Sequence, residues 1–297
     1  MLIDFHTHAQ PDAAAAAEFF ALIGGDRPTR NPGTPDDLFA KMDAVGVSRT
    51  LIVPWYPAQD MVDARVAAGE PRTTAVKAVI DHWRGLNEWA AGMARTHPDR
   101  ISSLVGFDPV LMTREEMEAE AALRLGQGAC GLKIAPMFFD RPADDPIVTP
   151  IWDIARKHGV FVLSECSSAH GFGHHAPCSH PRGFEAVARA YPDVRIQLAH
   201  LSNGAEDEVA RLTRDHRNIF ADLSLRLVGI GEPGQWSRAE VVEVIRNIGA
   251  DRVVYGTNYP IVDVAAFAET WRSLDLTDEE RAQIGWMNAE RLRHPVN

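Results

Sequence analysis

Hydrophobic and polar positions follow one another along the chain in a regular order of short and long segments. Short aliphatic or β-branched runs, typical of strands, are separated by longer amphipathic stretches that are typical of helices. The strand-like runs cover residues 2–5, 49–55, 100–107, 130–136, 160–165, 194–200, 218–225 and 252–258. The helix-like stretches include residues 35–46, 113–126, 149–159, 181–192, 205–216 and 239–250. Several of these stretches start at an acidic residue, serine or threonine and stop at glycine or proline, which is the usual punctuation of helices.

This alternation predicts the fold. Strands that alternate with helices form βαβ units and a parallel sheet, and eight such units in 297 residues favour a closed barrel over an open sheet. An open doubly wound sheet would also carry a phosphate-binding glycine signature after an early strand, and none is present. We therefore predict an α/β fold, a (β/α)₈ TIM barrel, as a single domain over residues 1–297. The interruptions at residues 10–34 and after Glu165 are interpreted as insertions over the barrel mouth.

Composition and charge argue against several classes of binding partner. The net charge of −11, without a basic cluster, argues against nucleic acid or an anionic membrane as a partner, and no apolar run is long enough to cross a bilayer. Cys130, Cys166 and Cys178 lack zinc-type spacing and are too few for a disulfide framework. The chain opens directly on a strand-like segment rather than on a signal peptide. We expect a cytoplasmic protein whose partner is a small-molecule substrate.

The first strand carries the strongest chemical signal. His6 and His8 lie two residues apart, so in an extended chain both imidazoles project to the same side and form half of a metal site. In a TIM barrel, catalytic groups gather at the carboxyl ends of the strands. Polar or aromatic residues occur at the ends of the other predicted strands as well: Trp55, Asp108, Lys133, Glu165, His200, Ser224 and Asn258.

At these positions the chain resembles the amidohydrolase superfamily, in its amidohydrolase-2 branch of aminocarboxymuconate-semialdehyde decarboxylase-like enzymes. The resemblance is carried by IDFHTH, GLKIAP, YPDVRIQLAHLSNG, RVVYGTNYPI and MNAERL, and it spans nearly the whole chain. It implies a divalent metal, usually zinc, bound by two histidines of the first strand, a histidine of the fifth and an aspartate of the eighth. It also implies an acid/base or electrostatic role for the histidine of the sixth strand, here His200, and a homodimer.

Two positions depart from that pattern, because Glu165 replaces the histidine and Asn258 replaces the aspartate. We expect His6, His8, Glu165 and Asn258 as metal ligands, and His200, Glu165 and Asn258 as catalytic residues. Zinc is the first expectation, and the oxygen ligands favour manganese or iron as alternatives. Two other interpretations stay open. Asn258 could orient substrate without touching metal, and a loop histidine could replace Glu165 as ligand, from among His170, His174, His175 and His180.

Further residues are candidates for substrate binding. Lys133 could pair with a substrate anion or, in carboxylated form, bridge metals. Trp55 and Tyr259 could wall a pocket for a cyclic or aromatic substrate. Arg226 could hold a substrate carboxylate, with pairing at the surface as the alternative. Asp4, two residues before His6, is the expected partner of an imidazole N–H.

The leading functional hypothesis is a metal-dependent hydrolase that cleaves an ester, lactone or amide through a metal-activated water. The alternative is a metal-dependent, non-oxidative decarboxylase of an aromatic or unsaturated acid, which the loss of the water-activating aspartate at Asn258 favours. The third hypothesis is a metal-free barrel with a binding role, since a fold alone does not fix a function.

Overall fold

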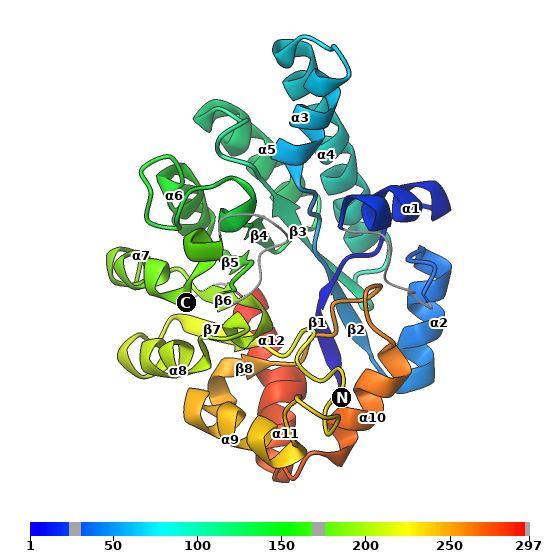
Figure 1. Cartoon of the computed structure of the whole chain (residues 1–297), viewed down its shortest axis with the longest axis vertical. Helices are drawn as coiled ribbons and strands as arrows, with labels where there is room; N and C mark the ends of the chain where they lie inside the picture. The colour runs from blue at the N-terminus through cyan, green and yellow to red at the C-terminus, as the bar shows by residue number, and fades with distance from the viewer. Residues whose placement is uncertain (24–30, 168–175, 295–297) are drawn as a thin grey trace.

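The strands form one parallel sheet that curls into a barrel (Figure 1). The computed structural model describes residues 1–23, 31–167 and 176–294. The sheet has eight strands in sequence order: β1 Ile3–Thr7, β2 Arg49–Ile52, β3 Ile101–Gly106, β4 Gly131–Ile134, β5 Phe161–Ser164, β6 Ile196–Leu198, β7 Ile219–Asp222 and β8 Val253–Val254. A parallel bridge between Thr7 and Tyr259 and a hydrogen bond from the Asn258 amide to the His6 carbonyl, 2.8 Å long, join the first strand to the last. The predicted (β/α)₈ barrel is confirmed.

Helices lie between successive strands and surround the sheet (Figure 1). They are α1 Ala13–Leu22, α2 Pro35–Val45, α3 Ala58–Ala67, α4 Arg72–Thr96, α5 Arg114–Gly126, α6 Thr149–His158, α7 Glu185–Ala190, α8 Glu206–Asp215, α9 Arg238–Ile248, α10 Val264–Ser273, α11 Asp278–Ala282 and α12 Asn288–Arg293. The predicted stretch 181–192 begins as a 3₁₀ turn, Pro181–Phe184, before α7.

Local sequence explains where these helices begin and end. Thr113 starts α5 with a capping box, in which its side chain bonds the Glu116 amide while the Glu116 carboxylate accepts from the Thr113 amide. Helices α2 and α6 stop at Gly46 and Gly159, whose φ angles of 76° and 65° lie in the left-handed region that glycine tolerates. The types of residue that predicted where the helices begin and end are therefore the ones that cap them in the structure.

Apolar side chains fill the barrel from several strands at once. Phe5 of β1 and Phe161 of β5 stack with ring centroids 5.5 Å apart. The pairing of β1 with β2 shifts register between Asp4 and Thr7, just before the two candidate ligand histidines. Such an irregularity turns a strand locally and re-aims its side chains. One buried cluster holds the interior together: Ile3, Phe5, Leu51, Val53, Leu104, Phe161, Leu163, Ala199, Phe220 and Val254.

The first predicted insertion, residues 10–34, contains α1 and reaches the candidate site. Asp12 caps α1 through hydrogen bonds from the amides of Ala14 and Ala15. The buried Phe19 of this helix lies 5.7 Å from the His8 ring, centroid to centroid. Helix α1 therefore lies over the end of the barrel where His8 lies. Within the described ranges, no helix is both long and apolar enough to span a membrane.

Candidate functional site

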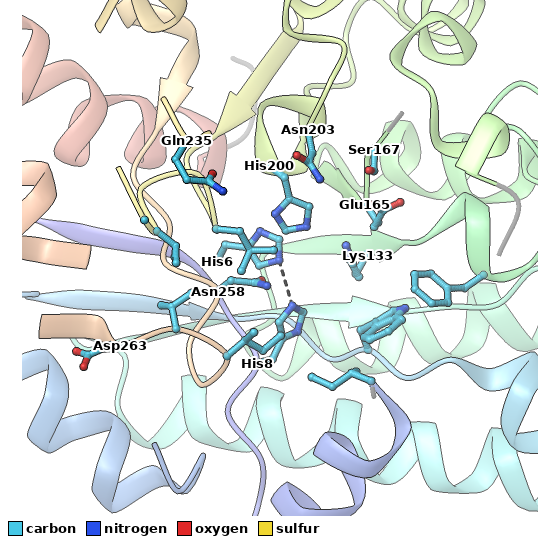
Figure 2. A pocket seen from close by; sticks show the side chains of 18 of the residues that line it. His6, His8, Lys133, Glu165, Ser167, His200, Asn203, Gln235, Asn258 and Asp263 are labelled. Atoms are coloured by element: carbon cyan, nitrogen blue, oxygen red, sulfur yellow. Dashed lines mark hydrogen bonds between the residues drawn. The ribbon is translucent and has the colours of Figure 1, made fainter. Parts of the chain in front are cut away.

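A cavity of about 630 Å³ opens among the carboxyl ends of the strands (Figure 2). It is lined by side chains from the ends of β1, β4, β5, β6 and β8 and from the loops that follow β2 and β7. The sequence-predicted residues that line it are His6, His8, Trp55, Lys133, Glu165, His200 and Asn258. Loops that follow strands supply the remainder of the wall: Ile23, Phe138, Ser167, Asn203, Leu225, Val228, Gly229, Glu232, Gln235, Ile261, Val262 and Asp263.

His6 and His8 face one another at the floor of this cavity. Their Nε2 atoms are 3.2 Å apart (Figure 2). The Nδ1 atom of His8 lies 2.9 Å from the Val53 carbonyl, which can only accept, so this nitrogen carries the proton. The Nδ1 atom of His6 lies 2.9 Å from the carboxylate of Asp222 and donates to it in the same way. Each Nε2 therefore offers a lone pair to the cavity.

The electrostatics of the pair favour a bound cation. Burial lowers the pKa of both His6 and His8, so both imidazoles are neutral. Two lone pairs that face each other at 3.2 Å repel unless an electrophile lies beside them.

Gly256 permits the close approach of the last strand, since a Cβ there would lie 2.9 Å from the His6 Cβ.

Two buried oxygens that line the same cavity have no hydrogen-bond partner among the described residues. They are Oδ1 of Asn258 and Oε2 of Glu165. Asn258 is 3% exposed and is held by its amide, which donates to the His6 carbonyl. An unpaired acceptor in a protein interior is costly, and a cation would satisfy it. Two imidazole nitrogens with two such oxygens are a donor set that fits a divalent metal ion.

Glu165 lies on the far side of the cavity from His6, next to Lys133 (Figure 2). Burial raises the pKa of Glu165, while a hydrogen bond from Ser179 and the charge of Lys133 oppose that shift. Burial likewise lowers the pKa of Lys133, and the charges of Glu165 and Asp222 oppose that shift. In the described part of the chain, potential metal-ligating atoms of His6, His200 and Asp222 all lie within 4.8 Å of one another. The atoms of His6, His8 and Glu165 do not form such a group. Coordination by Glu165 therefore stays a prediction.

His200 follows β6 and stacks on His6 with ring centroids 5.4 Å apart. Its Nδ1 lies 3.1 Å from the Ser224 carbonyl and therefore carries a proton. The Nε2 atom is then the nitrogen that can exchange a proton with a bound molecule. The close group of His6, His200 and Asp222 is internally paired, because the carboxylate accepts from His6 Nδ1 and from the His200 amide.

Aromatic side chains form another part of the wall. Trp55 and Phe138 meet edge to face with centroids 4.6 Å apart. The indole Nε1 of Trp55 is buried and has no hydrogen-bond partner within the described ranges. Tyr259 is not part of the described cavity lining. Its hydroxyl donates to Asp37 of α2, 2.8 Å away. Its contact with substrate stays a prediction.

Arg226 is also placed differently from the expectation. Its guanidinium pairs with Glu206 at 2.9 Å, bonds the Asn203 side chain and lies 4.1 Å from the centre of the Trp236 ring. It is absent from the described cavity lining. Arg226 therefore pairs with Glu206 as in the second interpretation, and its contact with a substrate carboxylate stays a prediction.

The loop after Glu165 carries the histidines considered as replacement ligands. His170, His174 and His175 lie outside the described residues. His180 lies before the 3₁₀ turn Pro181–Phe184 and accepts from the Arg182 amide, 3.2 Å away. Nδ1 of His180 therefore caps this turn. His180 is not part of the described cavity lining.

Asp222 is the functional side chain that the sequence reasoning missed. The expected imidazole partner, Asp4, instead accepts from the amide and the hydroxyl of Thr257, at 2.9 and 2.6 Å. Burial alone would raise the pKa of Asp222, but hydrogen bonds from His6 and Ser224 hold that pKa well below its usual range. A carboxylate within the apolar run NIFADLSL was the available signal, since buried aspartates are nearly always paired.

Comparison with known proteins agrees with this architecture. A family model described as Amidohydrolase (Amidohydro_2) matches residues 3–292. Among curated proteins, a gamma-resorcylate decarboxylase from Polaromonas sp. is 24% identical over 265 residues, which are 73% of this chain and 79% of that protein. A gamma-resorcylate decarboxylase from Rhizobium radiobacter is 26% identical over 116 residues, 35% of each chain.

Solved structures share the fold at low identity. An uncharacterized TIM-barrel protein from Bordetella bronchiseptica superposes with a TM-score of 0.74 at 18% identity, covering 98% of this chain and 97% of the other. A 2,6-dihydroxybenzoate decarboxylase from Rhizobium gives 0.68 at 16%, covering 98% of both chains. A 5-carboxyvanillate decarboxylase from Novosphingobium aromaticivorans, complexed with manganese and a nitrobenzoic acid, gives 0.69 at 14%, covering 98% and 95%. With a family model matched from the first strand to the last helix, this chain belongs to the amidohydrolase family.

Proposed function

We propose that this chain is a metal-dependent, non-oxidative decarboxylase of an aromatic carboxylic acid. The first expectation, a hydrolase of an ester, lactone or amide, is wrong. The curated relative that matches 73% of the chain is a decarboxylase, and structural neighbours that cover 98% of it are decarboxylases of dihydroxybenzoate and carboxyvanillate. Of the two metal-dependent reactions considered, the comparisons support only decarboxylation.

Asn258 is the observation in the site that carries this proposal. The aspartate expected at the end of β8 would take a proton from an attacking water, and the neutral amide of Asn258 cannot do this. Asp222 is saturated by donors, since its two oxygens already accept hydrogen bonds from His6, Gln197, His200 and Ser224. Decarboxylation consumes no water, so the lack of a carboxylate at this strand end does not impede it.

We assign metal binding to His6 and His8 through their Nε2 atoms, with the oxygens of Asn258 and Glu165 as the further ligands. When bound, a divalent ion would supply Lewis-acid stabilisation of the substrate's carboxylate and a neighbouring oxygen. Zinc stays a prediction from the two imidazoles. The two oxygen donors, and the manganese bound by the 5-carboxyvanillate decarboxylase, support manganese for this site.

The side chains of this chain would bind and orient the acid. The ammonium of Lys133, 2% exposed, supplies positive charge that can pair with the substrate anion. Trp55 and Phe138 offer flat apolar surface to a ring, and the indole N–H of Trp55, which has no partner in the described part of the chain, can donate to a ring oxygen. These contacts together would exclude water from the ring carbon that bears the carboxylate.

The reaction breaks the bond between that ring carbon and the carboxylate carbon. Carbon dioxide leaves, and the electron pair that stays on the ring carbon takes up one proton. His200 would take up this proton from solvent on Nε2 and deliver it to the ring carbon, since its Nδ1–H is held by the Ser224 carbonyl and the lone pair is on Nε2.

Product analysis tests the proposal directly. Protein reconstituted with Mn²⁺ or Zn²⁺ is incubated with 2,6-dihydroxybenzoate or 5-carboxyvanillate in D₂O, with carbon dioxide and ring deuterium as readouts. We expect equal amounts of both from at least one acid, and a kcat lower by about 100-fold in His200→Asn. Release of alcohol or amine from an ester, lactone or amide panel, without carbon dioxide from either acid, would contradict the proposal.

Metal content tests the ligand assignment. Elemental analysis of untagged protein is expected to find about one equivalent of a divalent metal, which His8→Ala and Glu165→Gln both lose. His158→Ala is the matched control, because His158 lies in the last turn of α6 and not in the described cavity lining. No metal after incubation with each ion would favour the third hypothesis, a metal-free barrel with a binding role.

A homodimer and a cytoplasmic location stay predictions. The three cysteines Cys130, Cys166 and Cys178 are free, in keeping with a reducing compartment. Sedimentation equilibrium would decide the oligomeric state, because a dimer has twice the 32.7 kDa mass of the chain.

A further inference from the structure

The carboxylate of Asp222 lies between the two functional histidines. Asp222 ends β7 and is fully buried. Its Oδ2 accepts from Nδ1 of His6 at 2.9 Å and from Nε2 of Gln197 at 2.8 Å. Its Oδ1 accepts from the amides of His200 and Ser224, both at 3.0 Å, and from the Ser224 hydroxyl. One side chain therefore contacts the strand ends of β1, β6 and β7.

The contact with His6 determines which ring nitrogen faces the cavity. An ionised carboxylate only accepts, so it keeps the imidazole proton on Nδ1 and leaves the lone pair on Nε2. That Nε2 atom is the one 3.2 Å from His8 Nε2. With the proton on the other nitrogen, His6 would present an N–H to the cation site and could not bind a metal ion there.

The contact with His200 acts on the backbone and on the ring. His200 and the three residues that follow it, 201–203, have φ angles between 32° and 67°, a left-handed turn that ordinary side chains disfavour. Asp222 accepts the amide hydrogen at the start of this turn. It also orients Ser224, whose hydroxyl and carbonyl lie 2.7 and 3.1 Å from Nδ1 of His200.

We propose that Asp222 is a positioning residue that sets the ring tautomers of both His6 and His200, and so prepares the metal-binding nitrogen and the proton-transferring nitrogen together. It acts on His6 directly and on His200 through Ser224. The inference rests on the proposed function only for the roles of the two histidines, since the tautomers themselves can be measured without metal or substrate.

The test is the tautomeric state of the histidine rings in metal-free protein, read by long-range ¹H–¹⁵N correlation spectra. In the unaltered protein both His6 and His200 are expected with the proton on Nδ1. In Asp222→Asn the amide no longer provides acceptors on both sides, and His6 is expected to move its proton to Nε2. The dissociation constant for Mn²⁺ or Zn²⁺, measured by competition with a chromophoric chelator, is expected to rise 10- to 100-fold.

Asp108→Asn is the matched control. It also removes a buried strand-end carboxylate, but Asp108 bonds Gln59 and the amides of residues 110 and 111 rather than a histidine. It is expected to leave both tautomers and the metal affinity unchanged. The proposal is overturned if His6 of the unaltered protein carries its proton on Nε2, or if Asp222→Asn changes neither the His6 tautomer nor the metal affinity.

Ser224→Ala keeps the test decisive if Asp222→Asn does not fold. It retains the carboxylate and removes only the hydroxyl, which lies 2.7 Å from Nδ1 of His200 and 3.1 Å from Nδ1 of His6. Because Asp222 still accepts from His6, that ring is expected to keep its proton on Nδ1 while the His200 resonances shift. A change at His6 with none at His200 would contradict the proposal. Because no readout uses turnover, a failed decarboxylation assay would leave this result standing.

Discussion

Buried carboxyl groups at the strand ends of this barrel differ in how well they are paired. Asp222 accepts from the His6 imidazole, the Gln197 side chain and the amides of His200 and Ser224. Among the described residues, Asp108, after β3, accepts from Gln59 at 2.9 Å and from two backbone amides. Asp108 is 3% exposed, and burial raises its pKa to about 6 although these hydrogen bonds oppose the shift. Neutral donors do not fully replace the hydration that this carboxylate loses.

This shift predicts a pH dependence of stability with a definite sign. Because the folded protein binds the Asp108 proton more tightly than the unfolded chain, with a pKa of about 6 against about 3.9, the contribution of Asp108 is largest below pH 4. It is lost as pH rises through 6, and amounts to about 2–3 kcal/mol. The free energy of unfolding is measured by urea titration for the unaltered protein and for Asp108→Asn, each at pH 4 and at pH 7. The difference between the two proteins is expected to change by that amount between the two pH values. A difference between the two proteins that is equal at both pH values would refute the assignment.

At the scale of elements, the turn after β6 is the unusual feature. The 3₁₀ segment η4, Ala199–Ser202, departs from helical geometry at His200 and Leu201, and the left-handed conformation continues through Ser202 and Asn203. Each such residue costs about 1–2 kcal/mol. The hydrogen bond from the His200 amide to Asp222 and the burial of Leu201 stabilise this turn against its strain. The strain is thus located beside the residue that we expect to transfer the proton.

Substitution of Ser202 measures this strain. Ser202 has a φ of 67° and is fully buried, so Ser202→Gly removes the steric cost of the left-handed backbone while Ser202→Ala keeps it. We expect the free energy of unfolding of the glycine variant to exceed that of the alanine variant by about 1 kcal/mol. Denaturant titration of the two variants side by side is the measurement. An alanine variant at least as stable as the glycine variant would show that the turn is not strained at this position.

At the scale of the whole molecule, the site joins the two ends of the chain. His6 lies in β1 and His8 directly after it, whereas Asn258 comes after β8. Backbone hydrogen bonds between residues 5–8 and 255–259 close the barrel at this point. Unfolding separates these groups by most of the chain. A metal ion bound by them therefore binds the folded barrel and not the unfolded chain.

Metal should accordingly stabilise the entire barrel. At a free metal concentration 100 times the dissociation constant, the gain is about 2.7 kcal/mol, which raises the melting temperature by roughly 5 °C or more in a chain of this size. Calorimetry with chelator and with added Mn²⁺ or Zn²⁺ would detect this shift. His8→Ala is expected to show none, and His158→Ala to show the full shift. An equal shift in His8→Ala would place the stabilising ion elsewhere.

Sequence by itself determined the architecture and the position of the site. The alternation of strand-like and helix-like segments gave the barrel because periodicity within a segment depends on local chain geometry. The pair His6 and His8 and the strand-end residues Lys133, Glu165, His200 and Asn258 could be assigned to one cavity because parallel strands bring their carboxyl ends to one side. The reaction was ranked wrongly, since hydrolase and decarboxylase share these residue types.

Tertiary structure alone decided which groups pair. Asp4 lies nearest to His6 in sequence, yet Asp222, 216 residues away, accepts the hydrogen bond from the imidazole. Arg226 follows a strand end but turns to Glu206 and Trp236 rather than to the cavity. Spacing along a strand fixes only the side to which a residue projects. Its partner depends on the register between strands, on the irregularity of β1 after Asp4 and on the path of each loop, all of which are set by contacts between distant segments.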